Sequence, residues 1–202
     1  MDDADTRLEG CAKPVYNSVR QPDALVAMNS VYTKFRTPST RDTGEFLLVL
    51  VKALNARRVL EIGTSNGYST LWLAFAVKTI SGHVTTVELS DFKVALATTN
   101  FERSGLSSYI TQIHGDATTL LKSNPDSSFD IIFLDSERSE YLRWWPDIKR
   151  TLRNGGLLVV DNAISHSFEM ATFMSLVADD QDFTTCTVPV GNGEFLATLA
   201  SK

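Results

Sequence analysis

Residues 58–71 read Arg-Val-Leu-Glu-Ile-Gly-Thr-Ser-Asn-Gly-Tyr-Ser-Thr-Leu. The short apolar run from Val59 to Ile62 predicts a buried strand, and the pattern that starts at Ser69 predicts a helix. Gly63 and Gly67 bound a turn of small polar residues between them. A strand, a glycine turn and a helix in this order leave free backbone N–H groups at a helix start, where a ligand can approach closely.

An acidic residue, Glu61, lies just before the first glycine of this turn. We expect its carboxylate to point into the turn, where it would disfavour a phosphate and favour a cationic group or a hydroxyl. The stretch therefore predicts a nucleoside-type ligand that carries positive charge rather than a dinucleotide.

Outward from this stretch, the chain alternates between strand and helix patterns. Several strands are continuous apolar runs, which are typical of a mostly parallel sheet covered on both faces. Strands are predicted at 58–63, 84–89, 109–114, 130–135 and 156–161, and helices at 67–79, 91–104, 116–123, 138–153 and 167–178. Residues 183–190 and 194–200 flank Gly-Asn-Gly and predict an antiparallel hairpin. The fold class is α/β, a doubly wound, mostly parallel sheet closed by this hairpin.

The chain before residue 58 predicts two additional N-terminal helices. Residues 1–21 are polar, and the apolar positions from 25 to 35 recur at helical spacing. A capping-box pattern at Asp42 begins a second helix that should end near Leu54. We found no repeat or linker, so 1–202 is predicted to be one domain, with 1–36 as an N-terminal arm and helix and 37–202 as the catalytic core.

Composition narrows the possible partners. The chain has 202 residues, 43% of them hydrophobic, and a net charge of −5, which suits one domain with a sizeable core and predicts no nucleic-acid partner. No apolar run approaches the roughly 18 residues of a membrane span, and the acidic N-terminus lacks the pattern of a secretory signal. Cys11 and Cys186 are far apart and read as reduced thiols, which predicts a cytoplasmic protein.

Acidic residues follow the ends of all five predicted central strands. Ligands bind at the carboxyl ends of the strands in open α/β sheets, so a row of acids there favours a functional set, although any one acid can simply cap a helix. The carboxylate of Glu88 suits a ribose diol, and Asp116 suits an N-cap beside an adenine. The acids and their amide neighbour are Glu61, Glu88, Asp116, Asp135, Asp161 and Asn162.

Asp135, Asp161 and Asn162 supply hard oxygen atoms from two adjacent strand ends. This donor set suits a magnesium- or calcium-like cation that water and substrate complete. Asp-Asn after a strand is also good turn chemistry, so the pattern alone leaves both interpretations open.

Two other classes of function compete with a site for a nucleoside-type ligand and a cation. Gly63 to Gly67 matches G-x-S-x-G, with Ser65 as a hydrolase nucleophile and His166 following the acids in the order of a catalytic triad. Three observations oppose a hydrolase. Only helix-like sequence precedes Val59, and no stretch resembles an oxyanion hole. A hydrolase mechanism would also give Glu88 no role. The third class is a module that binds the nucleoside-type ligand without turnover.

The combined motifs resemble a known family. The residues that carry the likeness are 59–70, 86–88, 115–117, 129–135, 155–162 and 188–193. Together they are similar to class I S-adenosylmethionine-dependent methyltransferases, and most of all to the cation-dependent O-methyltransferases that include catechol and caffeoyl-CoA O-methyltransferases and their bacterial relatives. The resemblance covers about residue 37 to the C-terminus.

The resemblance implies transfer of a methyl group from S-adenosylmethionine to a hydroxyl of a small acceptor. It implies a divalent cation, with Mg²⁺ as the first candidate, held by Asp135, Asp161 and Asn162. It also implies a homodimer. The implied cofactor-binding residues are Glu61, Gly63, Thr64, Ser65, Gly67, Tyr68, Ser69, Glu88, Asp116, Ala117 and Asp135.

One residue departs from the family pattern at the implied catalytic position. Members usually carry a lysine three residues after the metal-binding aspartate, where this chain has Arg138. An arginine stays protonated and cannot act as a general base, but it can stabilise a phenolate or bind a carboxylate or phosphate of the acceptor. Arg138 and Asp135 are therefore the catalytic candidates. Residues 163–167 also lack the Trp-Gly of catechol-type members.

Overall fold

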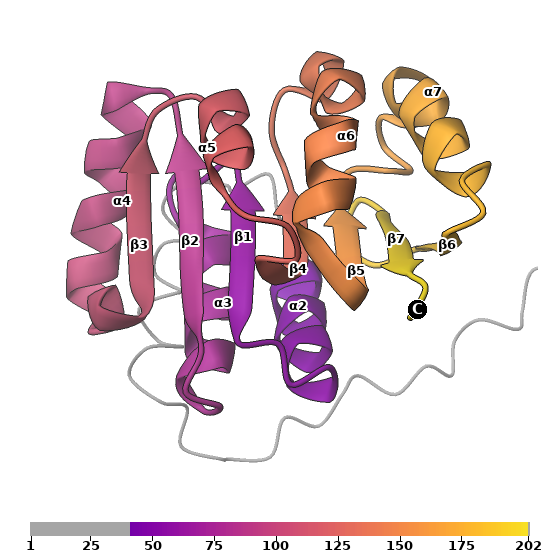
Figure 1. Ribbon diagram of the computed structural model, residues 1–202. Coiled ribbons are helices and arrows are strands. Elements are labelled where there is room, and N and C mark those ends of the chain that lie inside the picture. Colours follow the sequence, from indigo (N-terminus) through magenta and orange to yellow (C-terminus); the bar gives the residue numbers. More distant parts are fainter. Residues whose placement is uncertain (1–40, 202) are drawn as a thin grey trace, which may run out of the picture.

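The computed structural model describes residues 41–201, so the predicted N-terminal arm and first helix lie outside the described residues. Seven strands form one sheet in the order β3-β2-β1-β4-β5-β7-β6 (Figure 1). The strands are β1 (Arg58–Ile62), β2 (His83–Glu88), β3 (Ile110–His114), β4 (Phe129–Leu134), β5 (Leu152–Val160), β6 (Phe183–Val188) and β7 (Glu194–Leu199). Strands β1 to β5 are parallel, and β7 runs antiparallel to both β5 and β6. The predicted parallel sheet and closing hairpin are confirmed.

Helices cover both faces of the sheet (Figure 1). They are α2 (Arg41–Ala53), α3 (Tyr68–Lys78), α4 (Asp91–Ser104), α5 (Ala117–Ser123), α6 (Tyr141–Thr151) and α7 (Ser167–Ala178). One buried cluster joins α2, α3 and α4 to the sheet, and the other joins α5, α6 and α7. The second N-terminal helix predicted from the capping-box pattern is α2.

Side-chain alternation along each central strand builds these two cores. Ile131 and Phe133 of β4 pack with the cluster of α2 to α4, whereas Ile132 and Leu134 pack with that of α5 to α7. Because every residue of β4 is buried, each of its apolar side chains contributes about 1.5–3 kcal/mol of burial free energy. The sheet is therefore a rigid platform for the loops at its carboxyl edge.

The boundary between α6 and β5 differs from the prediction of a helix over 138–153. A 3₁₀ turn at Arg138–Glu140 precedes α6, and β5 begins at Leu152, inside the predicted helix. Leu152 pairs with Phe129 of β4, after which the register shifts. Gly155 has a positive φ of 67°, so the strand bends before its apolar run. The sequence pattern does not reveal this boundary, because an apolar residue at position 152 fits both the helical periodicity and a buried strand.

Candidate active site

A cavity of about 610 Å³ opens at the carboxyl ends of β1, β2 and β4. This volume lies within the range of small-molecule sites. Six of the predicted cofactor-binding residues line it, namely Gly63, Ser65, Glu88, Asp116, Ala117 and Asp135. The structure thus brings together residues that are up to 72 positions apart, from Gly63 to Asp135.

Glu88, at the end of β2, lines this cavity with 9% of its surface exposed. Its carboxylate accepts backbone hydrogen bonds from Ser65 (3.0 Å), Leu89 (3.1 Å) and Ser90 (3.0 Å). A carboxylate has about four acceptor sites, so capacity for a ligand hydroxyl remains. Glu88 therefore both holds the glycine turn against β2 and presents an acceptor to the cavity.

Asp116 and Trp144 form another wall. The Asp116 carboxylate caps α5 by accepting a hydrogen bond from the Thr119 backbone N–H (3.2 Å). Slight burial raises the pKa of Asp116, but the backbone N–H groups of Thr118 and Thr119 outweigh it, so the pKa lies below its ordinary value. The indole Nε1 of Trp144 donates to Thr118 Oγ1 (3.0 Å), which fixes the ring beside the cavity. An anionic acceptor and an aromatic surface thus lie together.

The structure corrects the expected orientation of Glu61. Its side chain is fully buried and does not line the cavity. The carboxyl group instead accepts hydrogen bonds from the hydroxyls of Ser69 (2.5 Å), Thr86 (2.6 Å) and Thr70. Burial raises the pKa of Glu61 to about 7, although those hydroxyls oppose the rise. Glu61 ties the first turn of α3 to the sheet from beneath the glycine turn.

The other predicted cofactor residues that do not line the cavity are Thr64, Gly67, Tyr68 and Ser69. Thr64, Tyr68 and Ser69 are each at most 5% exposed. Thr64 lies just before α3, and the other two residues begin it. Gly67 is the N-cap of α3 with φ 84°, and a Cβ there would lie 2.4 Å from the Phe101 ring. These residues shape the turn that Gly63 and Ser65 present to the cavity.

Sequence reasoning missed several residues of the cavity wall. Leu89 follows Glu88 directly and is 71% exposed, so it offers an apolar surface beside the strand end. Its place immediately after a strand-end acid was the available signal. The lining residues not predicted as cofactor contacts include Leu89, Lys93, Ser136, Glu137, Glu140, Arg143 and Trp144.

The candidate cation ligands lie side by side next to the cavity. Asn162 Nδ2 donates to Asp135 Oδ1 (3.0 Å), and the Asn162 backbone N–H donates to Asp161 Oδ1 (2.6 Å). Asn192 Nδ2 donates to Asn162 Oδ1 (3.1 Å), which anchors Asn162 from the hairpin. Asn162 also has a left-handed backbone with φ 68°, a strained conformation of the kind found at functional sites.

The donor set fits a hard cation through two carboxylates and one amide oxygen. Within residues 41–201, no three His, Cys, Asp or Glu side chains form a metal cluster. The nearby Glu194 nevertheless lies close to the negative charges of Asp161 and Asp135. Burial, and after it the charge of Asp161, raises the pKa of Glu194 to about 10. Excess negative charge around Asp135, Asp161 and Asn162 is what a cation would offset.

Comparison with known proteins shows the family of the chain. The family model described as "O-methyltransferase" matches residues 24–199. The chain belongs to the O-methyltransferase family. The Niastella koreensis catechol O-methyltransferase is 32% identical over 150 residues, which are 71% of this chain and 67% of that protein. The Mycobacterium tuberculosis H37Rv catechol O-methyltransferase is 36% identical over 124 residues, 60% of this chain and 54% of that protein.

The fold of this O-methyltransferase family member also matches solved structures. The O-methyltransferase TomG from Streptomyces achromogenes, involved in tomaymycin synthesis and solved in complex with S-adenosylmethionine, is 25% identical with a TM-score of 0.77. The alignment covers 92% of this chain and 93% of TomG. The Rossmann-like methyltransferase fold is thereby shown.

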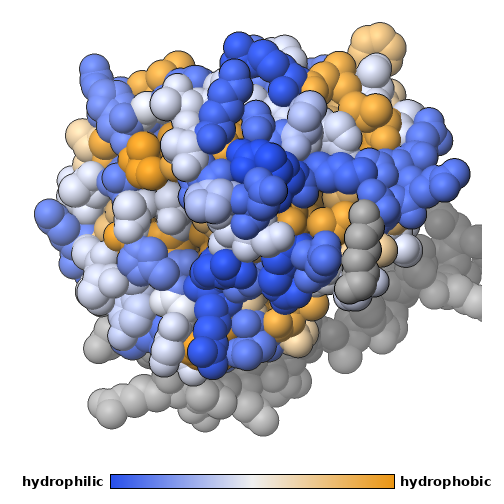
Figure 2. Space-filling model, in the orientation of Figure 1, coloured by the Kyte–Doolittle hydropathy of each residue, from blue (hydrophilic) through white to orange (hydrophobic). Residues whose placement is uncertain are grey.

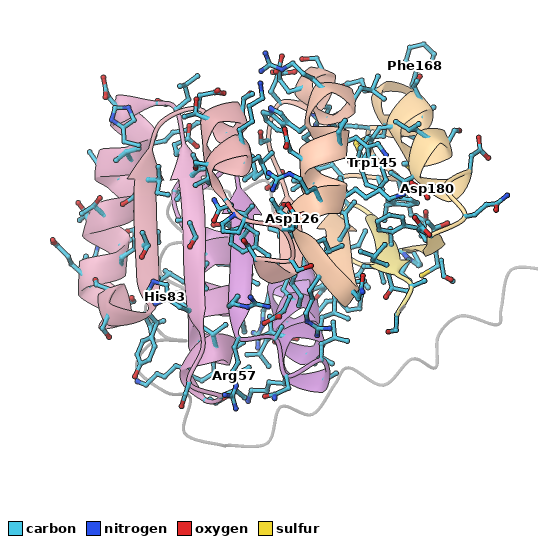
Figure 3. The ribbon with its side chains drawn as sticks, in the orientation of Figure 1. Arg57, His83, Asp126, Trp145, Phe168 and Asp180 are labelled. Carbon is cyan, nitrogen blue, oxygen red and sulfur yellow. The ribbon has the colours of Figure 1, made fainter. Side chains whose placement is uncertain are left out.

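Family membership and geometry both oppose the hydrolase alternative. The ring nitrogens of His83, His114 and His166 each contact groups other than Ser65 within the described chain. His166 bonds to the hydroxyl of Ser165 (2.9 Å). His83 begins β2 at the opposite, amino edge of the sheet (Figure 3), where its backbone N–H donates to the Arg57 carbonyl (2.7 Å). Ser65 therefore has no histidine base in this structure.

Arg138, the residue at the family's lysine position, follows the end of β4 in the 3₁₀ turn before α6. Its Nη1 lies 3.6 Å from Glu169 Oε2 of α7, and the two side chains are 24% and 55% exposed. A partly exposed pair at this distance contributes little stability. Arg138 is thus a cation at the same edge of the sheet as Asp135 and is only weakly held by its partner.

Proposed function

We propose that this protein transfers the methyl group of S-adenosylmethionine to a phenolic hydroxyl of a small acceptor, with help from a divalent cation. The observation that carries the proposal is one juxtaposition. The cavity that Glu88 and Trp144 line also reaches Asp135, and Asp135 is hydrogen-bonded to Asn162 of the candidate cation set. A nucleoside site and an oxygen-ligand site therefore meet at a single residue.

Each part of the cofactor has suitable partners in the cavity. Glu88 would accept hydrogen bonds from the ribose hydroxyls. The adenine would lie beside Asp116 and Ala117, with Leu89 and Trp144 as apolar surfaces. The methionine part would lie along Gly63 and Asp135, since the glycine turn exposes its backbone there. The complexes of TomG with S-adenosylmethionine and of the Bacillus cereus O-methyltransferase with S-adenosylhomocysteine support this choice of ligand.

Asp135, Asp161 and Asn162 would hold the cation, with Mg²⁺ as the first candidate. When bound, a divalent cation polarises the acceptor hydroxyl and lowers its pKa, so that an oxyanion is available near neutral pH. The protein's own contribution is to orient the acceptor oxygen toward the sulfonium methyl, and such orientation can supply several kcal/mol of the barrier reduction.

Two features indicate an aromatic acceptor with an anionic group. Phe168, at the beginning of α7, and Ile164, in the preceding loop, are 95% and 50% exposed. Phe168 lies at the end of the molecule toward which the parallel strands run (Figures 1 and 3), and apolar residues gather there on the surface (Figure 2). Arg138 adds a permanent positive charge. The names of the catechol O-methyltransferase relatives agree with a catechol-like ring.

Methyl transfer can be measured directly with tritiated S-adenosylmethionine and a panel of hydroxylated aromatic compounds. We expect label in the organic product with Mg²⁺ present and a large loss of turnover with EDTA or in Asp161→Asn. Transfer that is equally fast in EDTA would overturn the cation half of the proposal. No transfer to any acceptor, despite cofactor binding, would favour a binding module without turnover.

A further inference from the structure

A buried acid of the hairpin, Glu194, lies directly beside the candidate cation set. Val160 pairs with Phe195 in the antiparallel ladder of β5 and β7, so the next pair along the ladder places Asp161 opposite Glu194. Val160 and Phe195 both pack with the cluster of α5, α6 and α7. Because side chains alternate along strands, Asp161 and Glu194 both point to the other face, where α2 lies.

The contacts of Glu194 agree with this placement. Thr43 Oγ1 of α2 donates to Glu194 Oε1 (3.0 Å), and both residues are fully buried. The carboxyl group of Glu194 also contacts that of Asp161, which is 1% exposed. Glu194 Oε2 is buried and receives no hydrogen bond from any donor in residues 41–201. Thr43, Glu194 and Asp161 thus form a line from α2 to the cation set.

Burying a carboxyl group at this position costs desolvation free energy. An apolar side chain in the first position of β7 would fill the same space without the cost of desolvating an acid. The contacts of Glu194 with Thr43 on one side and its place opposite Asp161 on the other leave the Asp161 carboxylate little freedom to turn. Partners that fix a ligating carboxylate in this way commonly change metal affinity 10–100-fold when removed.

We propose that Glu194 is a positioning residue of the cation site, which fixes the Asp161 carboxylate and is itself fixed by Thr43. The inference rests on the proposed function, because it requires that Asp161 binds a cation. It adds a residue from β7 and a hydroxyl from α2 to a site otherwise formed by the ends of β4 and β5.

The test is Mn²⁺ binding to the protein saturated with S-adenosylhomocysteine, measured by titration calorimetry for Glu194→Leu and Glu194→Gln. Leucine removes the contact, so we expect affinity to fall about 10–100-fold. Glutamine can donate to Asp161 and accept from Thr43, so we expect affinity within about threefold of the wild type. The control pair is Glu102→Leu and Glu102→Gln, at an exposed acid of α4, and neither should change the affinity.

Thermal unfolding without metal separates positioning from a structural role. Because Glu194→Leu removes a buried acid, its melting temperature should equal or exceed that of the wild type, so weak Mn²⁺ binding could not be attributed to unfolding. Thr43→Val should weaken Mn²⁺ binding in the wild type but not further in Glu194→Leu, since both changes break the same line of contacts.

Three results would overturn the inference. Unchanged Mn²⁺ affinity in Glu194→Leu, with binding lost in Asp161→Asn, would reject the role of Glu194 and leave the cation site intact. Equal losses in Glu194→Gln and Glu194→Leu would show that charge, not a positioned hydrogen bond, matters. Absence of Mn²⁺ binding by the wild type, with S-adenosylhomocysteine still bound, would remove the cation half of the proposed function and this inference with it.

Discussion

A Cβ atom on Gly63 would lie 2.1 Å from the main-chain carbonyl oxygen of Asp135, so the glycine turn is in direct backbone contact with the end of β4. The Asp135 backbone N–H also donates to the Ile62 carbonyl (3.1 Å). This contact joins the two halves of the candidate site, since Gly63 belongs to the predicted cofactor turn and Asp135 to the predicted cation set. A shift on either side must displace the other.

Replacing Gly63 by alanine should therefore cost far more stability than the backbone angle alone explains. Gly63 and Gly105 both have positive φ, of 105° and 68°, but a Cβ on Gly105 would meet no atom within 4 Å. We expect Gly105→Ala to lower the free energy of unfolding by about 1 kcal/mol and Gly63→Ala to lower it by at least about 2 kcal/mol more. Urea unfolding measures both; equal losses would contradict the backbone contact.

The burial of Glu61 predicts a specific dependence of stability on pH. Its pKa is about 7 in the folded protein against 4.5 for the free side chain. The folded state thus retains a proton that the unfolded state releases above about pH 4.5, so the contribution of Glu61 to stability falls as pH rises toward 7. The fall amounts to about 3 kcal/mol at most and is complete above the folded-state pKa.

Glu61→Gln should remove this dependence. We expect the free energy of unfolding, measured in urea at about pH 5 and about pH 8, to change less between the two values in the variant than in the wild type. The absolute stability of the variant is not diagnostic, because an amide satisfies only part of the hydroxyl contacts of Ser69, Thr70 and Thr86. An identical pH response in both proteins would show that Glu61 is ionised throughout this range.

Tryptophan fluorescence should report cofactor binding through a single residue. Trp144 lines the cavity, whereas Trp145 packs against Phe173 and Phe183. The third tryptophan, Trp72, is buried in the opposite core. We expect S-adenosylhomocysteine to change the emission of the wild type, of Trp72→Phe and of Trp145→Phe, but hardly that of Trp144→Phe. A full response in Trp144→Phe would place the ligand elsewhere.

Arg138 should decide which acceptors are used rather than whether the cofactor binds. A charge-assisted hydrogen bond to an acceptor carboxylate contributes about 1.5–3 kcal/mol. In Arg138→Ala we therefore expect kcat/KM for 3,4-dihydroxybenzoate to fall about 10–100-fold, with a smaller change for catechol and an unchanged Kd for S-adenosylhomocysteine. Arg103→Ala, at an exposed position of α4, is the matched control. Equal losses for both acceptors would reject recognition of the carboxylate by Arg138.

The sheet could be predicted from sequence because its strands are marked by apolar runs and its turns by glycines. The orientation of Glu61 could not. Residues of β1 after Arg58 are buried on both faces of the sheet, so the pattern gives no sign of which side Glu61 faces. Only the placement of α3, which brings Ser69 and Thr70 over the strand, shows that the carboxyl group points beneath the turn.

The site was predictable where residues directly follow strand ends, as Glu88, Asp135 and Asp161 do. It was not predictable where contacts depend on register across the sheet. Glu194 lies in a segment that reads only as a hairpin strand, and its contact with Asp161 follows from the antiparallel pairing of β7 with β5. The start of β5 at Leu152 was missed for the same reason, since pairing with Phe129 decides it.

The most direct test of the account is calorimetric titration of S-adenosylhomocysteine into the wild type and Glu88→Ala, with and without Mg²⁺. Loss of the Glu88 carboxylate removes a charged acceptor for the ribose hydroxyls, so we predict one site per chain in the wild type and binding at least about tenfold weaker in the variant. Failure of the wild type to bind S-adenosylhomocysteine, or undiminished binding by Glu88→Ala, would contradict the proposed cofactor site.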